Sequence, residues 1–297
     1  WPKNMNDWLR KSAGYSCRAK LYHISKYLEF VLDECGATAD ASSGFFQMPL
    51  PPRAQQFMRF MDADGKIYQL LRVPMGLSLS VELMQLMMEV LIGNKEYVQQ
   101  QYVIDYVNSS AYIDDVRVTG NNKNVKKACN EINYNARCLN ITLKSPLSPS
   151  LSYTFLGATF DHNNHSLELG PKLRRKIPSS FDSTTIIGKD FHSLIGRLIH
   201  ATAMLRLPLI SNMLLVKWAA RKFNQFNRDP SLAEKEITIP PFAVTKLNNW
   251  CNVAHSTRFF YKKLNNNNKL VIYLDASKTG WGATVITPDL QIFHTGG

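Results

Sequence analysis

The chain has 297 residues, of which 45% are hydrophobic and 20% are charged. This length allows one large domain or two to three smaller ones, and the apolar content is ordinary for a protein with a real core. No apolar run reaches the roughly 18 residues of a membrane span, and no segment reads as a signal peptide, so we expect an intracellular protein, cytoplasmic or nuclear and not secreted, with no membrane partner.

Basic residues outnumber acidic ones by 35 to 23, which gives a formal charge of +12. Such a surplus favours a polyanionic partner, most often nucleic acid, although charge alone leaves a merely basic soluble protein as an equal alternative. The five cysteines are an odd number without tight spacing, which argues against a disulfide framework and against a zinc module.

The first half of the chain alternates helical and extended patterns. Residues 20–35 carry apolar positions at helical spacing and predict a helix that ends at Gly36. Residues 45–60 have strand-like aromatic runs broken by prolines. Residues 61–73 predict a hairpin that turns at Asp64-Gly65. Residues 78–92 predict a helix capped by Ser78 or Ser80.

Five further elements follow. We expect two short strands over residues 111–120, an amphipathic helix over 122–139, a strand pair over 152–161, a loop over 167–177 and a buried helix over 191–205. The run NNNNK at 265–269 is the best candidate for a linker, and residues 270–286 after it predict a strand, a turn and a second strand. Because the chain begins at Trp1 rather than Met, we expect a fragment of a longer polypeptide.

Two adjacent aspartates, Asp114 and Asp115, stand in an otherwise apolar stretch after Tyr112 and Ile113. Like charges side by side in such a setting are costly unless a cation neutralises them. Mg²⁺, a hard cation that prefers oxygen ligands, suits them best. A third carboxylate, Asp40, would complete a site for two ions that stabilise an in-line phosphoryl transfer. An Asp-Asp pair by itself is more often a solvated surface turn.

Five sequence motifs follow one another along the chain: DASSGFFQ at 40–47, RVPMGLSLSVELMQ at 72–85, YIDD at 112–115, Lys144, and FLG at 155–157. Together they resemble the reverse transcriptase family in order and spacing. The resemblance implies an α+β fold: a polymerase right-hand palm, an antiparallel sheet backed by helices, with partial fingers, thumb and connection, and a truncated ribonuclease H-like segment. The implied domains are 1–160 (fingers and palm), 161–264 (thumb and connection) and 265–297 (start of ribonuclease H).

The implied activity is that of an RNA-directed DNA polymerase from a retrotransposon polyprotein. Two Mg²⁺ ions, with Mn²⁺ as an alternative, would be held by Asp40, Asp114 and Asp115. One ion would activate a primer 3′-hydroxyl and the other would bind the triphosphate. The implied partners are an RNA template, a DNA or RNA primer, their RNA–DNA hybrid and deoxynucleoside triphosphates. Oligomeric state is left open.

The resemblance also assigns a nucleotide site, made of Ala41, Phe45, Met75, Gly76 and Lys144. Phe45 falls at the position of the family's steric gate, which excludes a 2′-hydroxyl. Core packing is the alternative for Phe45, since Phe46 must point the other way if the segment is extended. Met75 stands where a glutamine or phenylalanine is common, which puts its contact in doubt.

A second set of residues would contact primer and template: Tyr112, Phe155, Leu156, Gly157, Lys172, Arg174 and Arg175. The basic cluster at 172–176 could follow a phosphate backbone without reading sequence, and a solvated turn is the equal alternative. Residues 275–283 resemble the first hairpin of ribonuclease H, so Asp275 would be one of that site's metal-binding carboxylates. An ordinary β-hairpin is the alternative, and hydrolysis is implied for the parent protein only.

The region around residues 191–205 is similar to DIRS-like and VIPER-like retrotransposons. One departure from the family is that only 39 residues precede Asp40. The basic fingers residues that bind the triphosphate are therefore expected to be mostly missing, with Arg18 or Lys20 as substitutes. Two alternatives stay open. The first is a catalytically incomplete nucleic-acid-binding fragment of a decayed retroelement. The second is an RNA-directed RNA polymerase, against which Phe45 counts.

Overall fold

The computed structural model describes residues 2–262, 271–277, 280–287 and 291–296. The chain forms two compact units, Trp1–Phe260 and Tyr261–Gly297, and each is considered by itself. The linker predicted at 265–269 lies outside the described residues. The domain boundaries expected at residues 160 and 264 therefore stay predictions.

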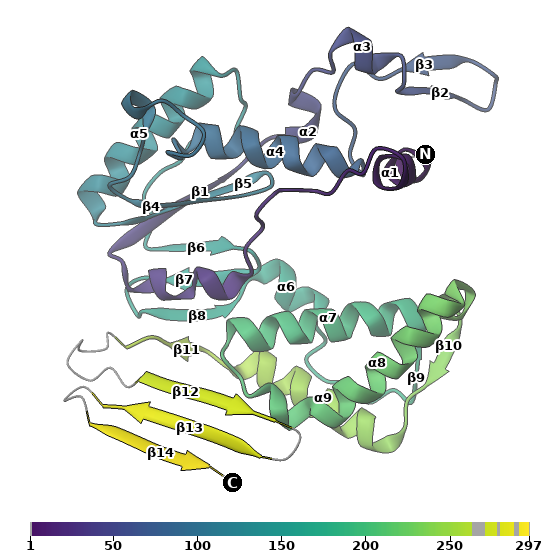
Figure 1. Ribbon diagram of the computed structural model, residues 1–297, viewed down its shortest axis with the longest axis vertical. Coiled ribbons are helices and arrows are strands. Elements are labelled where there is room, and N and C mark those ends of the chain that lie inside the picture. The colour runs from purple at the N-terminus through teal and green to yellow at the C-terminus, as the bar shows by residue number, and fades with distance from the viewer. Residues whose placement is uncertain (1, 263–270, 278–279, 288–290, 297) are drawn as a thin grey trace. The chain divides into compact units, whose positions relative to one another are not determined.

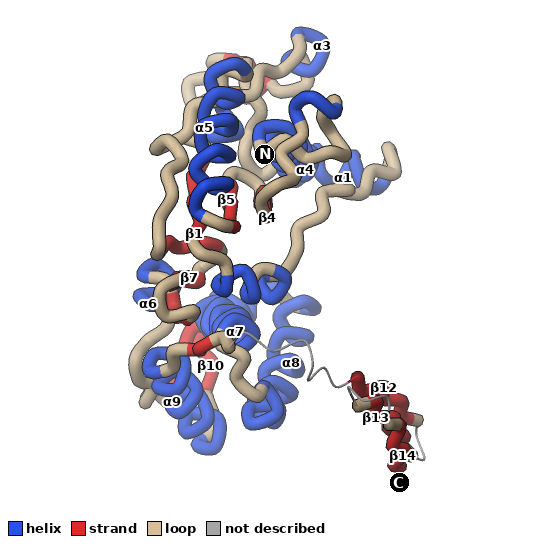
Figure 2. Tube along the Cα trace, turned by 90° about the vertical axis from the view of Figure 1, so that its left-hand side faces the viewer, coloured by secondary structure: helices blue, strands red, loops and turns tan. Residues whose placement is uncertain are grey.

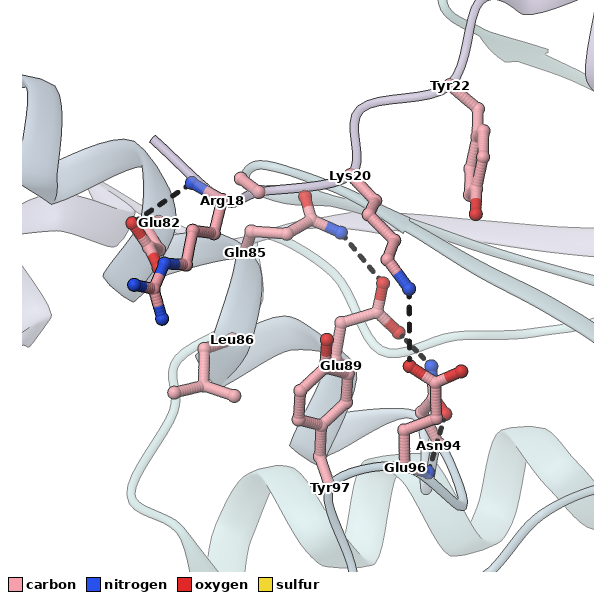
Figure 3. A pocket seen from close by; sticks show the side chains of 11 residues that line it. Arg18, Lys20, Tyr22, Glu82, Gln85, Leu86, Glu89, Asn94, Glu96 and Tyr97 are labelled. Atoms are coloured by element: carbon pink, nitrogen blue, oxygen red, sulfur yellow. Dashed lines mark hydrogen bonds and ion pairs between the residues drawn. The ribbon is translucent and has the colours of Figure 1, made fainter. Parts of the chain in front are cut away.

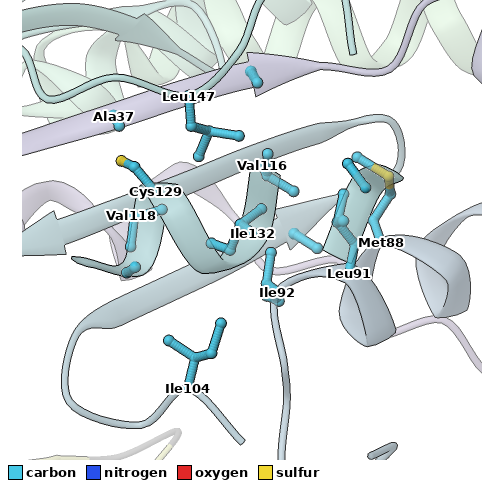
Figure 4. Close-up of a cluster of buried hydrophobic side chains, with 14 of the residues drawn as sticks. Ala37, Met88, Leu91, Ile92, Ile104, Val116, Val118, Cys129, Ile132 and Leu147 are labelled. Atoms are coloured by element: carbon cyan, nitrogen blue, oxygen red, sulfur yellow. The ribbon is translucent and has the colours of Figure 1, made fainter. Parts of the chain in front are cut away.

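The centre of the first unit is a three-stranded antiparallel sheet (Figure 1). Its strands, in spatial order, are β1 (Cys35–Asp40), β5 (Asp115–Gly120) and β4 (Asn108–Tyr112). Helices α4 (Ser78–Leu91) and α5 (Asn122–Cys138) pack on one face of it, where Val116, Val118 and Ile132 are fully buried (Figure 4). The alternation of a strand's side chains sends Arg117 and Thr119 of β5 to the opposite face.

A second antiparallel sheet lies against that opposite face. Its strands, in spatial order, are β11 (Phe259–Phe260), β8 (Ser166–Leu169), β7 (Ala158–Asp161) and β6 (Ser152–Phe155). The two sheets meet where the Gly36 amide donates to the Ser150 carbonyl at 3.0 Å and the Ser150 amide donates back at 2.7 Å. This close approach needs a residue without a side chain at position 36.

Helices dominate the rest of the first unit after β8. They are α6 (Pro171–Lys176), α7 (Gly188–Met204), η4 (Leu209–Asn212), α8 (Met213–Arg228), η5 (Pro230–Glu234) and α9 (Pro241–Ser256). The short strands β9 (Thr185–Ile187) and β10 (Glu236–Thr238) pair beside them. Figure 2 shows α7, α8 and α9 lying side by side. The Trp250 indole nitrogen of α9 donates to the Thr202 hydroxyl of α7 at 2.7 Å, inside the bundle.

The N-terminal part of the first unit contains short elements around a small apolar cluster. They are α1 (Pro2–Lys11), α2 (Gly44–Gln47), α3 (Pro52–Gln55), β2 (Arg59–Met61) and β3 (Ile67–Gln69); the short turn η3 (Gln100–Tyr102) comes later, between α4 and β4. Leu50, Met58, Val73 and Leu77 form the cluster, and Met5 is among the α1 residues that pack against it. The second unit is an antiparallel sheet of β12 (Val271–Ala276), β13 (Trp281–Ile286) and β14 (Ile292–Gly296).

The helix predicted over residues 20–35 is wrong. The segment contains two 3₁₀ turns, η1 (Ile24–Lys26) and η2 (Leu28–Leu32), and β1 already begins at Cys35, so that Gly36 lies inside a strand. The spacing of the apolar residues correctly indicated which side chains are buried, but it did not distinguish an α-helix from 3₁₀ turns. The Tyr27 carbonyl accepts from the Phe30 amide and from the Arg117 side chain, which favours tight turns over a continuous α-helix.

Three other expectations also need correction. The strand-like stretch at 45–60 folds mainly as the helical turns α2 and α3. The loop expected at 167–177 is strand β8 followed by α6. Neither Ser78 nor Ser80 caps α4, because Leu77 is the N-cap residue and the Asn6 side chain accepts from the Ser78 amide at 2.8 Å.

The remaining expected elements are confirmed: the hairpin at Asp64-Gly65, the helices at 78–92, 122–139 and 191–205, and the strand pairs at 111–120, 152–161 and 270–286. Gly65 has a φ of +79°, as a tight turn requires. Among the residues that the structure describes, no helix combines the length and apolar character needed to cross a bilayer.

Gly36→Ala should destabilise the first unit by about 1–3 kcal/mol, because the added methyl overpacks a filled space. The new Cβ would lie 2.5 Å from Cε1 of the buried Tyr153 and 2.9 Å from Cγ2 of Thr119. Gly196→Ala is the matched control, since it has no atom within 4 Å of its Cβ and should be neutral or slightly stabilising. Urea unfolding followed by circular dichroism measures both; equal stabilities would contradict the packing described here.

Candidate active site

The acidic pair lies at the tip of the β4–β5 hairpin, which turns through Ile113 and Asp114. Ile113 has a φ of +55°, a conformation that a β-branched residue adopts only under strain. Gln85 of α4 holds this turn: its side-chain oxygen accepts from the Ile113 amide at 2.7 Å, and its nitrogen donates to the Ala111 carbonyl at 3.0 Å. Helix α4 therefore positions both aspartates.

Gln85 was not predicted from the sequence, although its position on the apolar face of a helix could have identified it. It is buried, with 5% of its surface exposed, and it stands among the buried apolar positions Met84 and Met88 of the same helix. A buried amide must find hydrogen-bond partners, so a glutamine on the apolar face of a helix indicates a polar group opposite it.

Strand pairing brings Asp40 to the acidic pair. In the antiparallel register of β1 and β5, Asp40 lies directly opposite Asp115. The Ala41 amide donates to the Asp114 carbonyl at 2.9 Å, which fixes the end of β1 beside the turn. The structure therefore places the three predicted carboxylates together, although they are far apart in the sequence.

Lys144 lies at the same place. Its ammonium group forms an ion pair with Oδ2 of Asp40, and its backbone amide donates to the Asp40 carbonyl at 2.8 Å. The ion pair raises the pKa of the exposed Lys144. The other carboxylate oxygen of Asp40, Oδ1, is buried and has no hydrogen-bond partner.

The carboxylates carry more negative charge than the surrounding protein neutralises. Burial raises the pKa of Asp115 to about 6, and the nearby charges of Asp114 and Asp40 add to the effect, while Lys144 and Lys172 oppose it. Burial also raises the pKa of Asp114, against the lowering effect of its own backbone hydrogen bond. A bound cation would reverse both effects.

These residues fit a divalent metal ion by the chemistry of their donors. Hard carboxylate oxygens, one of them buried without a partner, are the ligands that Mg²⁺ prefers. Among the described residues, no three His, Cys, Asp or Glu side chains are already arranged as a metal-binding group. The Lys144 ammonium would have to leave Asp40 Oδ2 for an ion to take its place.

The segment after Asp40 departs from the extended conformation assumed in the sequence analysis. Gly44–Gln47 is a helical turn, so Phe45 and Phe46 need not point in opposite directions. Phe45 is half-buried and packs against both apolar clusters of the first unit, whereas Phe46 is 50% exposed. Phe45 therefore has a core contact and also a partly exposed surface near the end of β1.

The Pro-x-Gly turn is held by a residue that the sequence did not single out. The Asn6 amide of α1 donates to the Gly76 carbonyl at 2.8 Å, while its oxygen accepts from the Ser78 amide. Gly76 has a φ of +88°. Met75 beside it is 62% exposed, so its side chain is accessible to a ligand.

The FLG hairpin turns through Leu156 and Gly157, which have φ values of +49° and +82°. His200 of α7 lies 2.9 Å, through its Nε2, from the Leu156 carbonyl. Phe155 is only 2% exposed, so its side chain lies in the interior, and any contact with a primer would come from the turn. Tyr112, at the end of β4, is half-buried beside the aspartates.

The three predicted basic contacts on α6 differ in their surroundings. Lys172 is exposed and close enough to Asp115 to lower its pKa. Arg174 forms an ion pair with Glu168 at 3.5 Å and donates to the His255 carbonyl at 3.2 Å. Arg175 donates to the Pro171 carbonyl of its own helix. The charge of Lys172 thus acts on the carboxylate group.

A hollow of about 330 Å³ lies between α4 and the extended segment before η1 (Figure 3). Arg18 and Lys20, named above as substitutes for the triphosphate-binding fingers residues, both line it. Lys20 lies 3.8 Å from the Glu96 carboxylate, and the Arg18 amide donates to Glu82 at 3.3 Å. Within the hollow, Glu96 therefore pairs with the Lys20 side chain, whereas Glu82 holds the backbone of Arg18. Asp275 belongs to the second unit, where it lies on β12 opposite Gly282.

Residues 21–160 match the family model described as reverse transcriptase (RNA-dependent DNA polymerase). These residues form a reverse transcriptase domain. Such domains are RNA-directed DNA polymerases, a class of nucleotidyltransferase. No curated protein sequence matches the chain.

Solved structures of foamy viral protease-reverse transcriptase share the fold of this chain. One, the dRH form with double-stranded DNA, gives a TM-score of 0.59 at 17% identity, over 94% of this chain and 46% of that one. Another, with an RNA/DNA hybrid, gives a TM-score of 0.58 at 19% identity, over 94% of this chain and 36% of that one. A third, with double-stranded DNA, gives a TM-score of 0.55 at 20% identity, over 93% of this chain and 54% of that one. The chain thus spans about half or less of each.

The predicted α+β right-hand polymerase architecture is confirmed by these similarities. The assignments of nucleotide-binding, primer-binding and metal-binding residues stay predictions, and so does the ribonuclease H character of the second unit. The retrotransposon origin and the DIRS-like or VIPER-like subgroup are also expectations.

Asp115→Asn should stabilise the metal-free protein at about pH 7.5 but not near pH 4. An acid whose pKa rises on folding, here from 3.8 to about 6, binds more protons in the folded state, so stability falls as pH rises between these values. Asparagine removes this cost, and the expected gain is about 1–2 kcal/mol, discounted because the side chain is partly exposed.

Urea unfolding in the presence of a chelator at several pH values tests this. The exposed Asp182→Asn is the control and should leave the pH profile unchanged. Parallel profiles for Asp115→Asn and the parent protein would contradict the electrostatics described above.

Proposed function

We propose that this reverse transcriptase domain adds deoxynucleotides to a primer 3′-hydroxyl, directed by an RNA template, as part of a retrotransposon polyprotein. The observation that carries the proposal is the meeting of Asp40, Asp114 and Asp115 at the ends of β1 and β5, with a buried carboxylate oxygen that has no protein partner. Carboxylates arranged in this way are suited to metal-assisted phosphoryl transfer.

The residues proposed to hold two Mg²⁺ ions, or Mn²⁺, are Asp40, Asp114 and Asp115, with the Ala41 carbonyl beside them. When bound, the ions would lower the pKa of the primer hydroxyl and neutralise charge on the triphosphate. Lys144 holds Asp40 through an ion pair and would be released toward the negatively charged triphosphate when a cation takes its place. Gln85 keeps the strained turn at Ile113 in place throughout.

The proposed partners are an RNA template, a DNA or RNA primer, the RNA–DNA hybrid and deoxynucleoside triphosphates. The foamy viral structures contain double-stranded DNA or an RNA/DNA hybrid. The chain's charge of +12 and the exposed Lys172 near Asp115 support a polyanionic partner at this face. Selection against ribonucleotides is assigned to Phe45, which also argues against an RNA-directed RNA polymerase.

Asp114→Asn should reduce primer extension on an RNA template by on the order of 10³-fold or more, because one negative ligand of the metal site is lost. Binding of a fluorescent RNA–DNA hybrid, measured by anisotropy, should change little. Asp182→Asn, an exposed aspartate outside the site, should extend primers like the parent.

A variant at Asp114 that extends primers as fast as the parent would refute the assignment of this residue. If the parent chain binds the hybrid but extends no primer at all, the alternative of a catalytically incomplete nucleic-acid-binding fragment is supported instead.

Phe45→Val should raise the ratio of ribonucleotide to deoxynucleotide incorporation by about 10–100-fold, because a smaller side chain removes the clash with the 2′-hydroxyl. Phe46→Val is the matched control: the ring next to it in sequence is more exposed and should leave the ratio unchanged. Single-nucleotide additions with each triphosphate at matched concentrations measure the ratio. Equal ratios in parent and Phe45→Val would assign Phe45 to core packing alone.

A further inference from the structure

Arg117 is a fully buried arginine two residues after the catalytic pair. Its exposed fraction is 0%, and it stands first among the largest fully buried side chains of the described residues. Its Nη1 donates to the Tyr27 carbonyl at 3.2 Å, whereas Nε and Nη2 make no hydrogen bond of good geometry, although the Tyr153 side chain lies close to the guanidinium group. A buried guanidinium with so few polar contacts needs another source of stabilisation.

Four aromatic rings surround the guanidinium group. Its central carbon lies 5.0 Å from the ring centroid of Tyr27, 4.8 Å from Phe30, 5.2 Å from Phe155 and 5.5 Å from Phe160. Ring faces at these distances attract a cation, most strongly where water is excluded. We refer to these four residues as the aromatic cage. Burial lowers the pKa of Arg117, although an arginine remains protonated in proteins.

The cage residues come from two different parts of the domain. Tyr27 and Phe30 belong to the 3₁₀ segment before β1. Phe155 ends β6, immediately before the Leu156-Gly157 turn, and Phe160 lies in β7. One side chain of β5 therefore contacts both strands of the FLG hairpin, while Asp115 at the start of β5 belongs to the catalytic group.

The surroundings are more polar than an ordinary core. Thr119 Oγ1 and His162 Nε2 are buried without hydrogen-bond partners, and the buried Tyr153 hydroxyl interacts with the Arg117 side chain without a hydrogen bond of good geometry. Buried charged and polar groups stabilise a fold less than apolar packing would. They are instead suited to favour one relative arrangement of the two sheets over others. Because a guanidinium group is planar and stacks on aromatic rings, it also restricts the orientation of the surrounding rings more than an aliphatic side chain would.

We propose that Arg117 is a positioning residue that sets the FLG hairpin, and through it the primer 3′ end, at a fixed distance from Asp114 and Asp115. This inference rests on the polymerase function proposed above. A change at the cage shifts the turn at Leu156-Gly157 relative to β5 without touching nucleotide or metal. Small displacements of a reacting group are costly, since about 1 Å can reduce a rate by on the order of 10²-fold.

The test uses Arg117→Met, which keeps chain length but removes charge and plane, and Arg117→Lys, which keeps charge alone. In rapid-quench assays of the first nucleotide addition, the rate constant of Arg117→Met should fall about 10–100-fold. The dissociation constant of the deoxynucleotide should change less than about twofold, because the nucleotide site is intact. Arg117→Lys should recover only part of the rate, and Arg228→Met, an exposed arginine at the end of α8, should behave like the parent.

A merely structural role predicts a different outcome, namely a smaller burst amplitude with an unchanged rate constant, and this would overturn the proposal. If Arg117→Met does not fold, Phe155→Leu removes one ring of the cage and should lower the same rate constant. A parental rate in that variant would also overturn it.

Hydrogen–deuterium exchange separates this proposal from the proposed function. Without any substrate, Arg117→Met should increase exchange over residues 152–161 and leave the helix Asn122–Cys138 unchanged. If the parent extends no primer, the polymerase proposal fails, while the exchange result still shows whether Arg117 holds the hairpin. Exchange that is unchanged over 152–161, or raised equally throughout the unit, would overturn the positioning role.

Discussion

The antiparallel register between β1 and β5 is the constraint on which the site depends. It places Asp40 opposite Asp115 at the ends of both strands. A slip of one residue would turn every side chain of β1 to the other face and separate the carboxylates. The register is held by burial on both faces: Ala37 and Val118 face the helices, whereas Gly36 and Thr119 face the second sheet. The stability of the sheet and the chemistry of the site therefore have the same origin.

The site concentrates charge that the protein leaves incompletely balanced. The strained turn at Ile113 and the raised pKa of Asp115 are local costs. Helix α4 stabilises the strained turn through the two hydrogen bonds of Gln85. Lys144 partly neutralises Asp40 from outside the sheet. Two residues further along β5, Arg117 carries the opposite charge in an aromatic environment. One strand thus joins the carboxylates to the hairpin that would contact the primer.

Much of the site was predictable because it is encoded in short motifs. Asp40, the acidic pair and Lys144 were all named from the sequence, and the strands and helices with clear periodicity formed where expected. The errors fell where burial and hydrogen bonding with distant residues decide the local conformation. Residues 20–35 have helical spacing, but the Tyr27 carbonyl is shared with Arg117, and the segment forms 3₁₀ turns instead.

The sequence by itself indicated the family of residues 21–160 and named the candidate residues of the proposed site, because the acidic and glycine-containing motifs follow one another in a recognisable order along the chain. Only the tertiary structure decided which residues hold that site in place. Gln85, Asn6 and Arg117 act through contacts with partners 28, 70 and 90 positions away. Such contacts arise when strands and helices pack, and no local periodicity or motif records which distant backbone group a buried polar side chain will meet.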